Sequence, residues 1–248
     1  MLNLELREHV DRDAILPYSS SFPWEEYMPT FQTSLTSSAG LVVGSDRTAA
    51  YYTPEPGGGF TVQSYEAFKF IRNPDDSVIC VAAGGSSSMT FARNIALNAK
   101  PDASEAVWQK NVHDVAMAVP RPSQPWPFDE ILVIRPGDIS GVWIVTRTED
   151  SASVVKNESH ICIGDRSHAR LLPAILWKPA LPVDRLEVLA RLTLSYASVL
   201  NPSGVGHGFD ILTIRPGGQV SWKNFLVDGF ERPFTEQISK AFGAIPAI

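Results

Sequence analysis

The residues with the clearest chemical potential lie in the stretch 30–46, TFQTSLTSSAGLVVGSD. A threonine opens this stretch and an aspartate closes it sixteen residues later, with two strand-like runs and the small-residue turn SSAG between them. Such a pattern predicts a β-hairpin, which would bring Thr30 and Asp46 to the same end of one sheet. A threonine hydroxyl is a poor nucleophile at neutral pH and needs a base within hydrogen-bond distance. The pair is therefore a candidate for nucleophilic chemistry.

A third candidate residue, Lys69, lies in the run FKFI, and the run VICVAAGG follows it and ends at a helical pattern. Each of the three residues also has an ordinary structural interpretation. Threonine is common in strands, Asp46 beside Arg47 is typical of a nearly neutral surface ion pair, and Lys69 between two phenylalanines fits a strand residue that faces solvent. The spacing of Thr30, Asp46 and Lys69 favours the chemical interpretation.

The elements that must position these residues alternate between strand and helix patterns. Strand-like runs fill most of residues 31–83, helical patterns follow at 86–99 and 105–119, strands return over 131–165, helical patterns cover 166–177 and 182–200, and strands close the pattern over 209–227. This order predicts an α+β fold, a four-layer α/β/β/α sandwich of two antiparallel sheets flanked by helices. We expect the 30–83 block and the 130–164 block to form the two sheets, as one domain over residues 30–248 preceded by an extension over residues 1–29.

In this order and spacing, the chain resembles the β-subunits of the proteasome family, within the N-terminal nucleophile hydrolases. Three motifs carry the resemblance: Thr30 at the head of a hairpin, GLVVGSD ending in Asp46, and FKFI with VICVAAGG, which contain Lys69 and Gly84. The later run HICIGDRSHARLL is similar to the family's strand–turn–helix. The resemblance covers residues 30–220, is strongest over 30–100, and indicates a divergent bacterial proteasome homologue.

The resemblance implies a role for each residue of the motifs. Thr30 would be the nucleophile, and its α-amino group, freed by cleavage before residue 30, would be the base, since an unperturbed α-amine has a pKa of about 7.7–8.0. The Lys69 ammonium would hold this amine closer to neutral, Asp46 would pair with Lys69, and the backbone N–H of Gly84 would stabilise an oxyanion.

Two positions depart from the family pattern. Asp165 stands where the family has a serine that assists the threonine, so we include Asp165 among the candidate catalytic residues. Pro29 stands where glycine is usual, and proline restricts the backbone at the bond that must be cut.

The function implied by the resemblance is that of a threonine-type endopeptidase. Its N-terminal nucleophile, Thr30, would be exposed by autoprocessing, which removes residues 1–29 as a propeptide. The resemblance implies a homo-oligomeric ring, peptide or unfolded-protein substrates, an ATPase unfoldase as a compatible partner, and no cofactor. Two alternatives stay open: a non-catalytic scaffold or partner-binding subunit that retains the extension, and a small-molecule amidase of the same superfamily.

Composition narrows the classes of partner. The formal net charge of −6 argues against general nucleic-acid binding, and no apolar run approaches the roughly 20 residues that span a bilayer, so we expect no membrane partner. The two cysteines, Cys80 and Cys162, lie in apolar runs and are typical of reduced core residues in a cytoplasmic protein. Trp108, Trp126 and Trp177 are candidate contacts between subunits because interfaces favour large aromatic residues.

Overall fold

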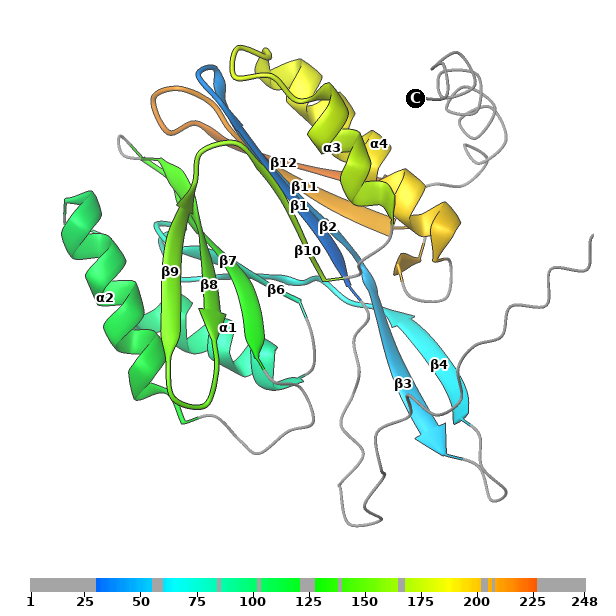
Figure 1. Cartoon of the computed structure of the whole chain (residues 1–248), viewed down its shortest axis with the longest axis horizontal. Helices are drawn as coiled ribbons and strands as arrows, with labels where there is room; N and C mark the ends of the chain where they lie inside the picture. The colour runs from blue at the N-terminus through cyan, green and yellow to red at the C-terminus, as the bar shows by residue number, and fades with distance from the viewer. Residues whose placement is uncertain are drawn as a thin grey trace, which may run out of the picture.

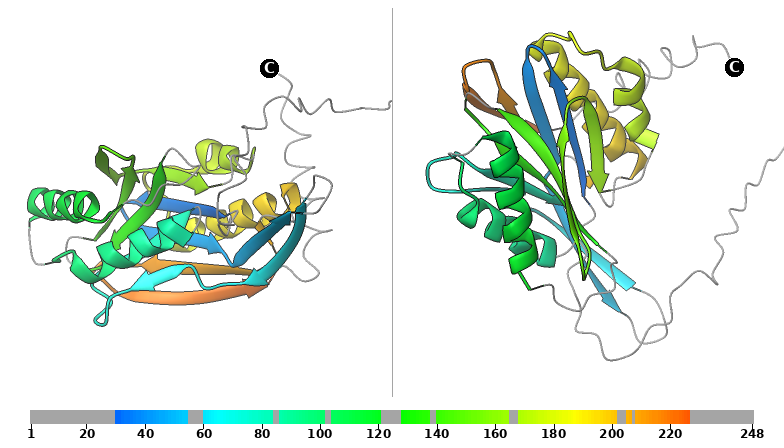
Figure 2. Two further views of the ribbon diagram at one scale, coloured as in Figure 1. Left: turned by 90° about the horizontal axis from the view of Figure 1, so that it is seen from below. Right: turned by 60° about the vertical axis from the view of Figure 1, so that its left-hand side comes forward.

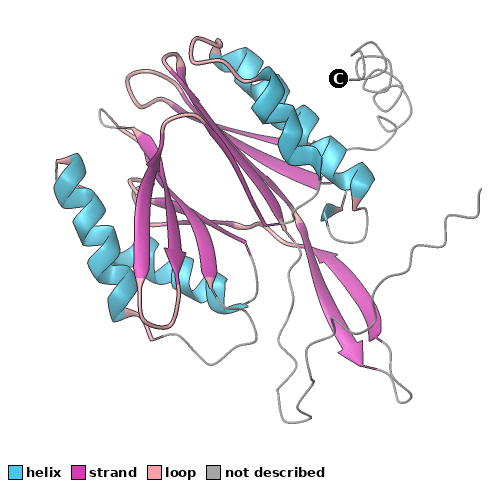
Figure 3. Ribbon diagram, in the orientation of Figure 1, coloured by secondary structure: helices cyan, strands magenta, loops and turns pink. Residues whose placement is uncertain are grey.

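A computed structural model provides the structure of the chain. It describes residues 30–54, 60–83, 86–101, 104–120, 128–137, 140–164, 168–201, 205–206 and 208–226. The elements form two stacked antiparallel sheets with a pair of helices on each outer face (Figures 1 and 3). The predicted four-layer α/β/β/α sandwich is confirmed.

The first sheet contains the hairpin predicted from residues 30–46. Its strand order is β10-β1-β2-β11-β12, all neighbours antiparallel. The strands are β1 (Phe31–Ser37), β2 (Gly40–Asp46), β10 (His160–Gly164), β11 (Gly208–Ile214) and β12 (Val220–Leu226). Helices α3 (Leu171–Leu176) and α4 (Val183–Leu200) cover its outer face, and a short 3-10 turn, η2 (His168–Arg170), precedes α3.

The second sheet has the order β5-β6-β7-β8-β9. Its strands are β5 (Phe70–Arg72), β6 (Ile79–Ala83), β7 (Asp129–Arg135), β8 (Gly141–Arg147) and β9 (Ala152–Asn157). Helices α1 (Ser86–Asn98) and α2 (Glu105–Ala118) cover its outer face, as the two views in Figure 2 show. The 3.6-residue pattern that predicted α1 is confirmed, because Ala92, Ile95 and Ala96 are fully buried and Met89 packs against the same cluster.

Three apolar layers hold the sandwich together. One lies between each sheet and its helices, and the third lies between the two sheets, where residues such as Leu41, Val43, Val81 and Leu212 meet. Each strand contributes apolar side chains to the layers on both faces of its sheet, since successive side chains point to opposite sides. On β1, for example, Phe31 and Leu35 face α4 and leave the intervening even-numbered positions for the space between the sheets.

A buried polar network fixes the first turn of α1 on the second sheet. The Ser88 hydroxyl donates to Asp129 Oδ1 at 2.8 Å, and Arg147 Nη2 donates to Asp129 Oδ2 at 2.7 Å. All three side chains are at most 3% exposed. Arg147 also donates to the carbonyl of Val119 at the end of α2. The network therefore ties both helices to strands β7 and β8.

The assignment of strands to sheets differs from the sequence-based expectation. The 30–83 block does not form one sheet: β1 and β2 join β10, β11 and β12, whereas β5 and β6 join β7, β8 and β9. The expected long strands also break, one at Arg47 and one at Ala67–Lys69. The local sequence pattern predicts that a segment is a strand, but it does not specify which strand it pairs with. Strands that are close in sequence therefore lie in different sheets.

Between these two breaks the chain forms a separate antiparallel hairpin, β3 (Thr48–Pro54) with β4 (Phe60–Glu66). Figure 1 shows the hairpin projecting from the end of the sandwich. The Ala67 N–H donates to the carbonyl of Arg47 at 2.6 Å, and the Arg47 N–H donates to the carbonyl of Gly208 at 2.8 Å, so the root of the hairpin is tied to β11. The hairpin root thus joins the end of β2 to the segment that carries Lys69.

The tryptophans predicted as contacts between subunits differ in their burial. Trp108 is fully buried in the cluster beneath α2, so its assignment to a subunit contact was wrong; Trp126 lies outside the described residues. Trp177 is partly buried, and its indole N–H donates to the carbonyl of Thr36.

Both cysteines are free, with Cys80 buried and Cys162 partly exposed. Among the described helices, none has the length and apolar character needed to cross a membrane.

Candidate active site

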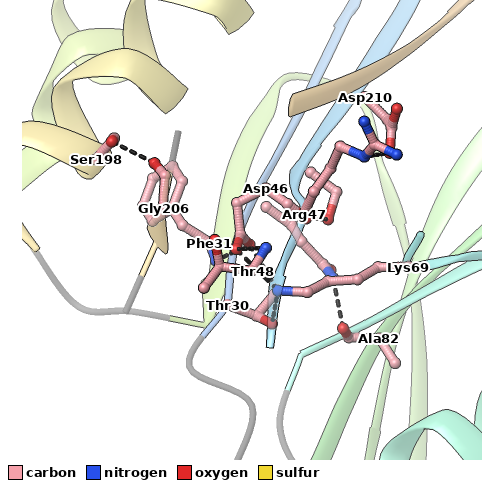
Figure 4. A network of polar contacts seen from close by, with 12 residues as sticks. Thr30, Phe31, Asp46, Arg47, Thr48, Lys69, Ala82, Ser198, Gly206 and Asp210 are labelled. Atoms are coloured by element: carbon pink, nitrogen blue, oxygen red, sulfur yellow. Dashed lines mark hydrogen bonds and ion pairs between the residues drawn. The ribbon is translucent and has the colours of Figure 1, made fainter. Parts of the chain in front are cut away.

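The three candidate residues Thr30, Asp46 and Lys69 meet at one end of the sandwich. Thr30 directly precedes β1, Asp46 is the last residue of β2, and Lys69 directly precedes β5 of the other sheet. The hairpin β1–β2 brings Thr30 and Asp46 together. The chain returns through β4, and Lys69, at the start of the second sheet, reaches both residues (Figure 4). The predicted convergence is present.

Lys69 connects the other two side chains. Its ammonium nitrogen Nζ lies 2.5 Å from Thr30 Oγ1 and 2.9 Å from each carboxylate oxygen of Asp46. Thr30 is 2% exposed, Lys69 1% and Asp46 0%. The solvent-facing interpretation of Lys69 is therefore wrong: Phe68 is the exposed neighbour, at 47%. A lysine so placed can exchange a proton with the threonine hydroxyl.

Backbone donors complete the shell around Asp46. The Phe31 N–H donates to Oδ1 at 2.8 Å and the Thr48 N–H donates to Oδ2 at 2.9 Å. Each carboxylate oxygen thus accepts one backbone bond and one bond from Lys69. Because every partner fixes a different direction, the carboxylate is held in one orientation and holds Lys69 in turn. The interpretation of Asp46 as a surface partner of Arg47 is wrong, since Arg47 instead pairs with Asp210 and Glu66.

Burial shifts both charged groups toward their neutral forms. It raises the pKa of Asp46 from 3.8 to about 6, against the opposing attraction and hydrogen bonds of Lys69 and the two backbone donors. Burial also lowers the pKa of Lys69 below its ordinary value, against the attraction of Asp46. A lowered lysine pKa increases the fraction of neutral amine, which is the form that can accept a hydroxyl proton.

These shifts predict that the stability of the folded chain depends on pH. The folded state binds a proton at Asp46 more tightly than the unfolded state, so the contribution of Asp46 to stability is present below pH 3.8 and is lost as the pH rises through about 6.

Urea denaturation between pH 4 and pH 7 tests this prediction, with Asp46→Asn as the variant whose side chain at this position does not titrate. The free energy of unfolding of the wild type, relative to that of Asp46→Asn, should fall by on the order of 2–3 kcal/mol over this range. A relative stability that stays constant or rises with pH would contradict the shift.

Gly164, at the end of β10, allows this strand to approach Thr30. Its φ is +86°, and a Cβ atom there would lie 1.9 Å from the carbonyl oxygen of Thr30. Any larger residue would therefore collide with the backbone that carries the candidate nucleophile. The same Cβ position is 3.5 Å from Ala83 Cβ at the end of β6, so both sheets meet beside Thr30.

Two of the five predicted catalytic residues lie outside the described residues: Gly84, which follows β6, and Asp165, which follows β10. The described segments end one residue before each of them, at Ala83 and Gly164. Their roles therefore stay predictions. Pro29 and the extension over residues 1–29 are also outside the described part of the chain.

The sequence interpretation missed the backbone donors of Phe31 and Thr48, and it missed Gln32. The Thr48 contact had a signal, since an aspartate that accepts from the N–H two residues later forms an Asx turn. Gln32 also had a sequence signal, because a residue two positions after Thr30 on a strand shares its face.

Among the described residues, no group of three or more histidine, cysteine or acidic side chains is placed to hold a metal ion.

Comparison with known proteins gives structural matches only. Neither protein-family models nor curated proteins match the sequence. Solved structures do match: Anbu from Hyphomicrobium sp. strain MC1 at 11% identity and a TM-score of 0.60, its Gly-1 mutant at 12% and 0.61, and Anbu (ancestral beta-subunit) from Yersinia bercovieri at 13% and 0.59. Each match covers 88% of this chain and 99% of the other. The fold is of the proteasome type.

The family predicted from the sequence needs correction. These structural neighbours are Anbu proteins, which are related to the proteasome but form a distinct family, so the identification as a proteasome β-subunit was wrong. Identities of 11–13% establish the fold alone. The motifs led to the right architecture because they mark two of its elements, the β1–β2 hairpin and the passage from β6 to α1.

Proposed function

We propose that the chain is a threonine peptidase on a proteasome-type fold, with the Thr30 hydroxyl as nucleophile and residues 1–29 as a propeptide removed by self-cleavage. The observation that carries the proposal is the buried contact of 2.5 Å between Lys69 Nζ and Thr30 Oγ1, with the same nitrogen ion-paired to Asp46. A buried lysine with a lowered pKa against a hydroxyl is an arrangement that activates nucleophiles.

Self-cleavage would begin in the uncut chain, where the nitrogen of Thr30 is part of an amide and cannot accept a proton at neutral pH. Neutral Lys69 is within hydrogen-bond distance of the hydroxyl and would take its proton as Oγ1 attacks the carbonyl carbon of Pro29. The C–N bond then breaks, the nitrogen of Thr30 receives the proton, and residue 29 is left as an ester on Oγ1. The α-amine is thereby freed. Water then hydrolyses the ester, which releases residues 1–29 with a C-terminal carboxylate and frees the Thr30 hydroxyl.

Peptide hydrolysis would repeat this chemistry with the freed α-amine in place. The amine accepts the hydroxyl proton while Oγ1 attacks the substrate carbonyl, and it returns the proton to the leaving amine. Lys69, which is neutral at the start of self-cleavage, would in this step carry a proton as an ammonium held by Asp46, and its positive charge would lower the pKa of the nearby α-amine. Water completes the cycle by hydrolysing the acyl ester.

The proposal is tested by comparing the full chain with a form that begins at Thr30. Intact-mass measurement of the full chain should give a product that starts at Thr30. The pre-cut form should hydrolyse peptides and should be inhibited by peptide epoxyketones, which trap an N-terminal threonine. Light scattering on the full chain should give a mass above the 27.1 kDa of one 248-residue chain, since we propose a homo-oligomer.

A different result would support the scaffold alternative, which Pro29 favours because proline restricts the bond to be cut. That alternative holds if the full chain stays intact and the assembled pre-cut form is inert across a broad peptide library. An active pre-cut form together with an uncut full chain would locate the obstacle at Pro29, and Pro29→Gly should then restore cleavage.

A further inference from the structure

Gln32 makes a polar bridge between the two sheets close to Thr30. It lies two residues after Thr30 on β1, and its paired neighbour Ile163 belongs to the apolar layer between the sheets. The side chain is fully buried. Its amide nitrogen Nε2 donates to the carbonyl of Ala82 on β6 at 2.5 Å. Figure 4 shows Ala82 at the border of the Thr30–Asp46–Lys69 cluster.

Core stability does not account for this amide. The surrounding layer is apolar, and the amide oxygen Oε1 of Gln32 is buried without a hydrogen-bond partner among the described residues. A buried polar atom without a partner is unfavourable, so the unpaired oxygen offsets the stability that the bond to Ala82 contributes. The carbonyl of Ala82 only accepts, so the amide nitrogen must face it and the amide oxygen points away from it.

The bridge joins the strand of the candidate nucleophile to the strand opposite it. Ala82 is one residue from the end of β6, and the end of β6 lies beside Thr30, since the Cβ position of Gly164 is near both Ala83 and the Thr30 carbonyl. A bond from Gln32 to Ala82 therefore limits how far β1 and β6 can separate or slide at the level of the site.

We propose that Gln32 is a positioning residue, which fixes Thr30 relative to the end of β6 and so to a substrate carbonyl bound between the sheets. This inference rests on the proposed peptidase function. Displacements of about 1 Å at a reacting centre can reduce a rate up to about 100-fold. Loss of the bridge should therefore lower the rate of the chemical step more than the affinity for substrate.

The test uses the form that begins at Thr30 with Gln32→Met, which keeps the length of the side chain and removes its donor. The matched control is Ser34→Ala, because Ser34 is the next residue on the same face of β1 and accepts a bond of 3.2 Å from Asn157 of the other sheet. Both variants lose one polar contact between the sheets, but only Gln32→Met loses it beside the site.

We expect Gln32→Met to lower kcat between about 10-fold and 100-fold, with KM within about twofold. Its melting temperature should change little, because the lost bond to Ala82 is offset by removal of the unpaired amide oxygen. The pH profile of kcat should keep its shape because the Lys69–Asp46 pair is untouched. Ser34→Ala should keep kcat within about twofold.

The possible failures are distinguishable. If the wild type is active and both Gln32→Met and Ser34→Ala leave kcat unchanged, the positioning role of Gln32 is overturned and the peptidase proposal stands. Equal losses in Gln32→Met and Ser34→Ala would also overturn it, since they would indicate a general loosening of the sheets. An inert wild type would overturn both proposals together.

Discussion

Lys69→Met is expected to abolish both self-cleavage before Thr30 and peptide hydrolysis. Methionine fills a similar apolar volume but cannot hold a proton near Thr30 Oγ1, where the lysine nitrogen lies at 2.5 Å. Removing a group that stabilises or transfers charge at a reacting centre typically lowers kcat by about 10²–10³ or more. Intact mass and peptide turnover would measure the two losses, with Lys110→Met, an exposed lysine on α2, as the control.

Stability should also fall in Lys69→Met, for a reason that a second variant can separate from catalysis. Removal of one partner leaves Asp46 buried with an uncompensated charge, which typically costs on the order of 3–5 kcal/mol. The double variant Lys69→Met/Asp46→Asn removes that charge, while the asparagine oxygen can still accept a backbone bond. We expect it to regain most of the lost stability and none of the activity.

Recovery of activity in the double variant, or full activity in Lys69→Met, would contradict the role given to Lys69. Loss of activity that follows loss of folded protein in every variant would assign the pair to stability alone. Denaturation curves and turnover measured on the same samples distinguish these outcomes.

Thr30→Ala should have the largest effect on catalysis and a small effect on the fold. It removes the only group proposed to form the covalent intermediate, so turnover should fall by at least about 10⁴-fold, and the full chain should keep residues 1–29. Lys69 keeps its two contacts with Asp46, so the melting temperature should change little. Thr30→Ser, which keeps the hydroxyl, should retain measurable cleavage.

The matched control for Thr30→Ala is Thr33→Ala. Thr33 is a buried threonine on the same strand, and its hydroxyl accepts a weak bond from the thiol of Cys162, away from the Lys69–Asp46 pair. This variant should keep wild-type turnover. Cleavage of the Thr30→Ala chain at the same position, detected by intact mass, would show that another group performs the reaction.

The sequence alone determined the local elements and the identity of the clustered residues. The SSAG turn between two strand runs fixed the β1–β2 hairpin, and with it the proximity of Thr30 and Asp46 at one end. The 3.6-residue patterns located α1, α2 and α4 to within a few residues. These features depend on neighbours in sequence, through turn chemistry and the alternation of apolar side chains, and a sequence displays such information directly.

Other features of the site were decided by contacts between distant segments. The run FKFI is compatible with a lysine that faces either solvent or the core, and the break between β4 and β5 turned Lys69 inward and left Phe68 outside. Likewise, no local pattern indicated that the donor of Gln32 would meet the carbonyl of Ala82, fifty residues away.

The division of neighbouring strands between the two sheets was also decided by contacts between distant segments. Strand β1 pairs with β10 and β2 pairs with β11, each more than one hundred residues further along the chain. A strand's own residues specify which face is apolar, but any strand with a matching apolar face satisfies that requirement. Only the simultaneous packing of four helices on two sheets selects the partners, and this packing buries Thr30, Asp46 and Lys69 together.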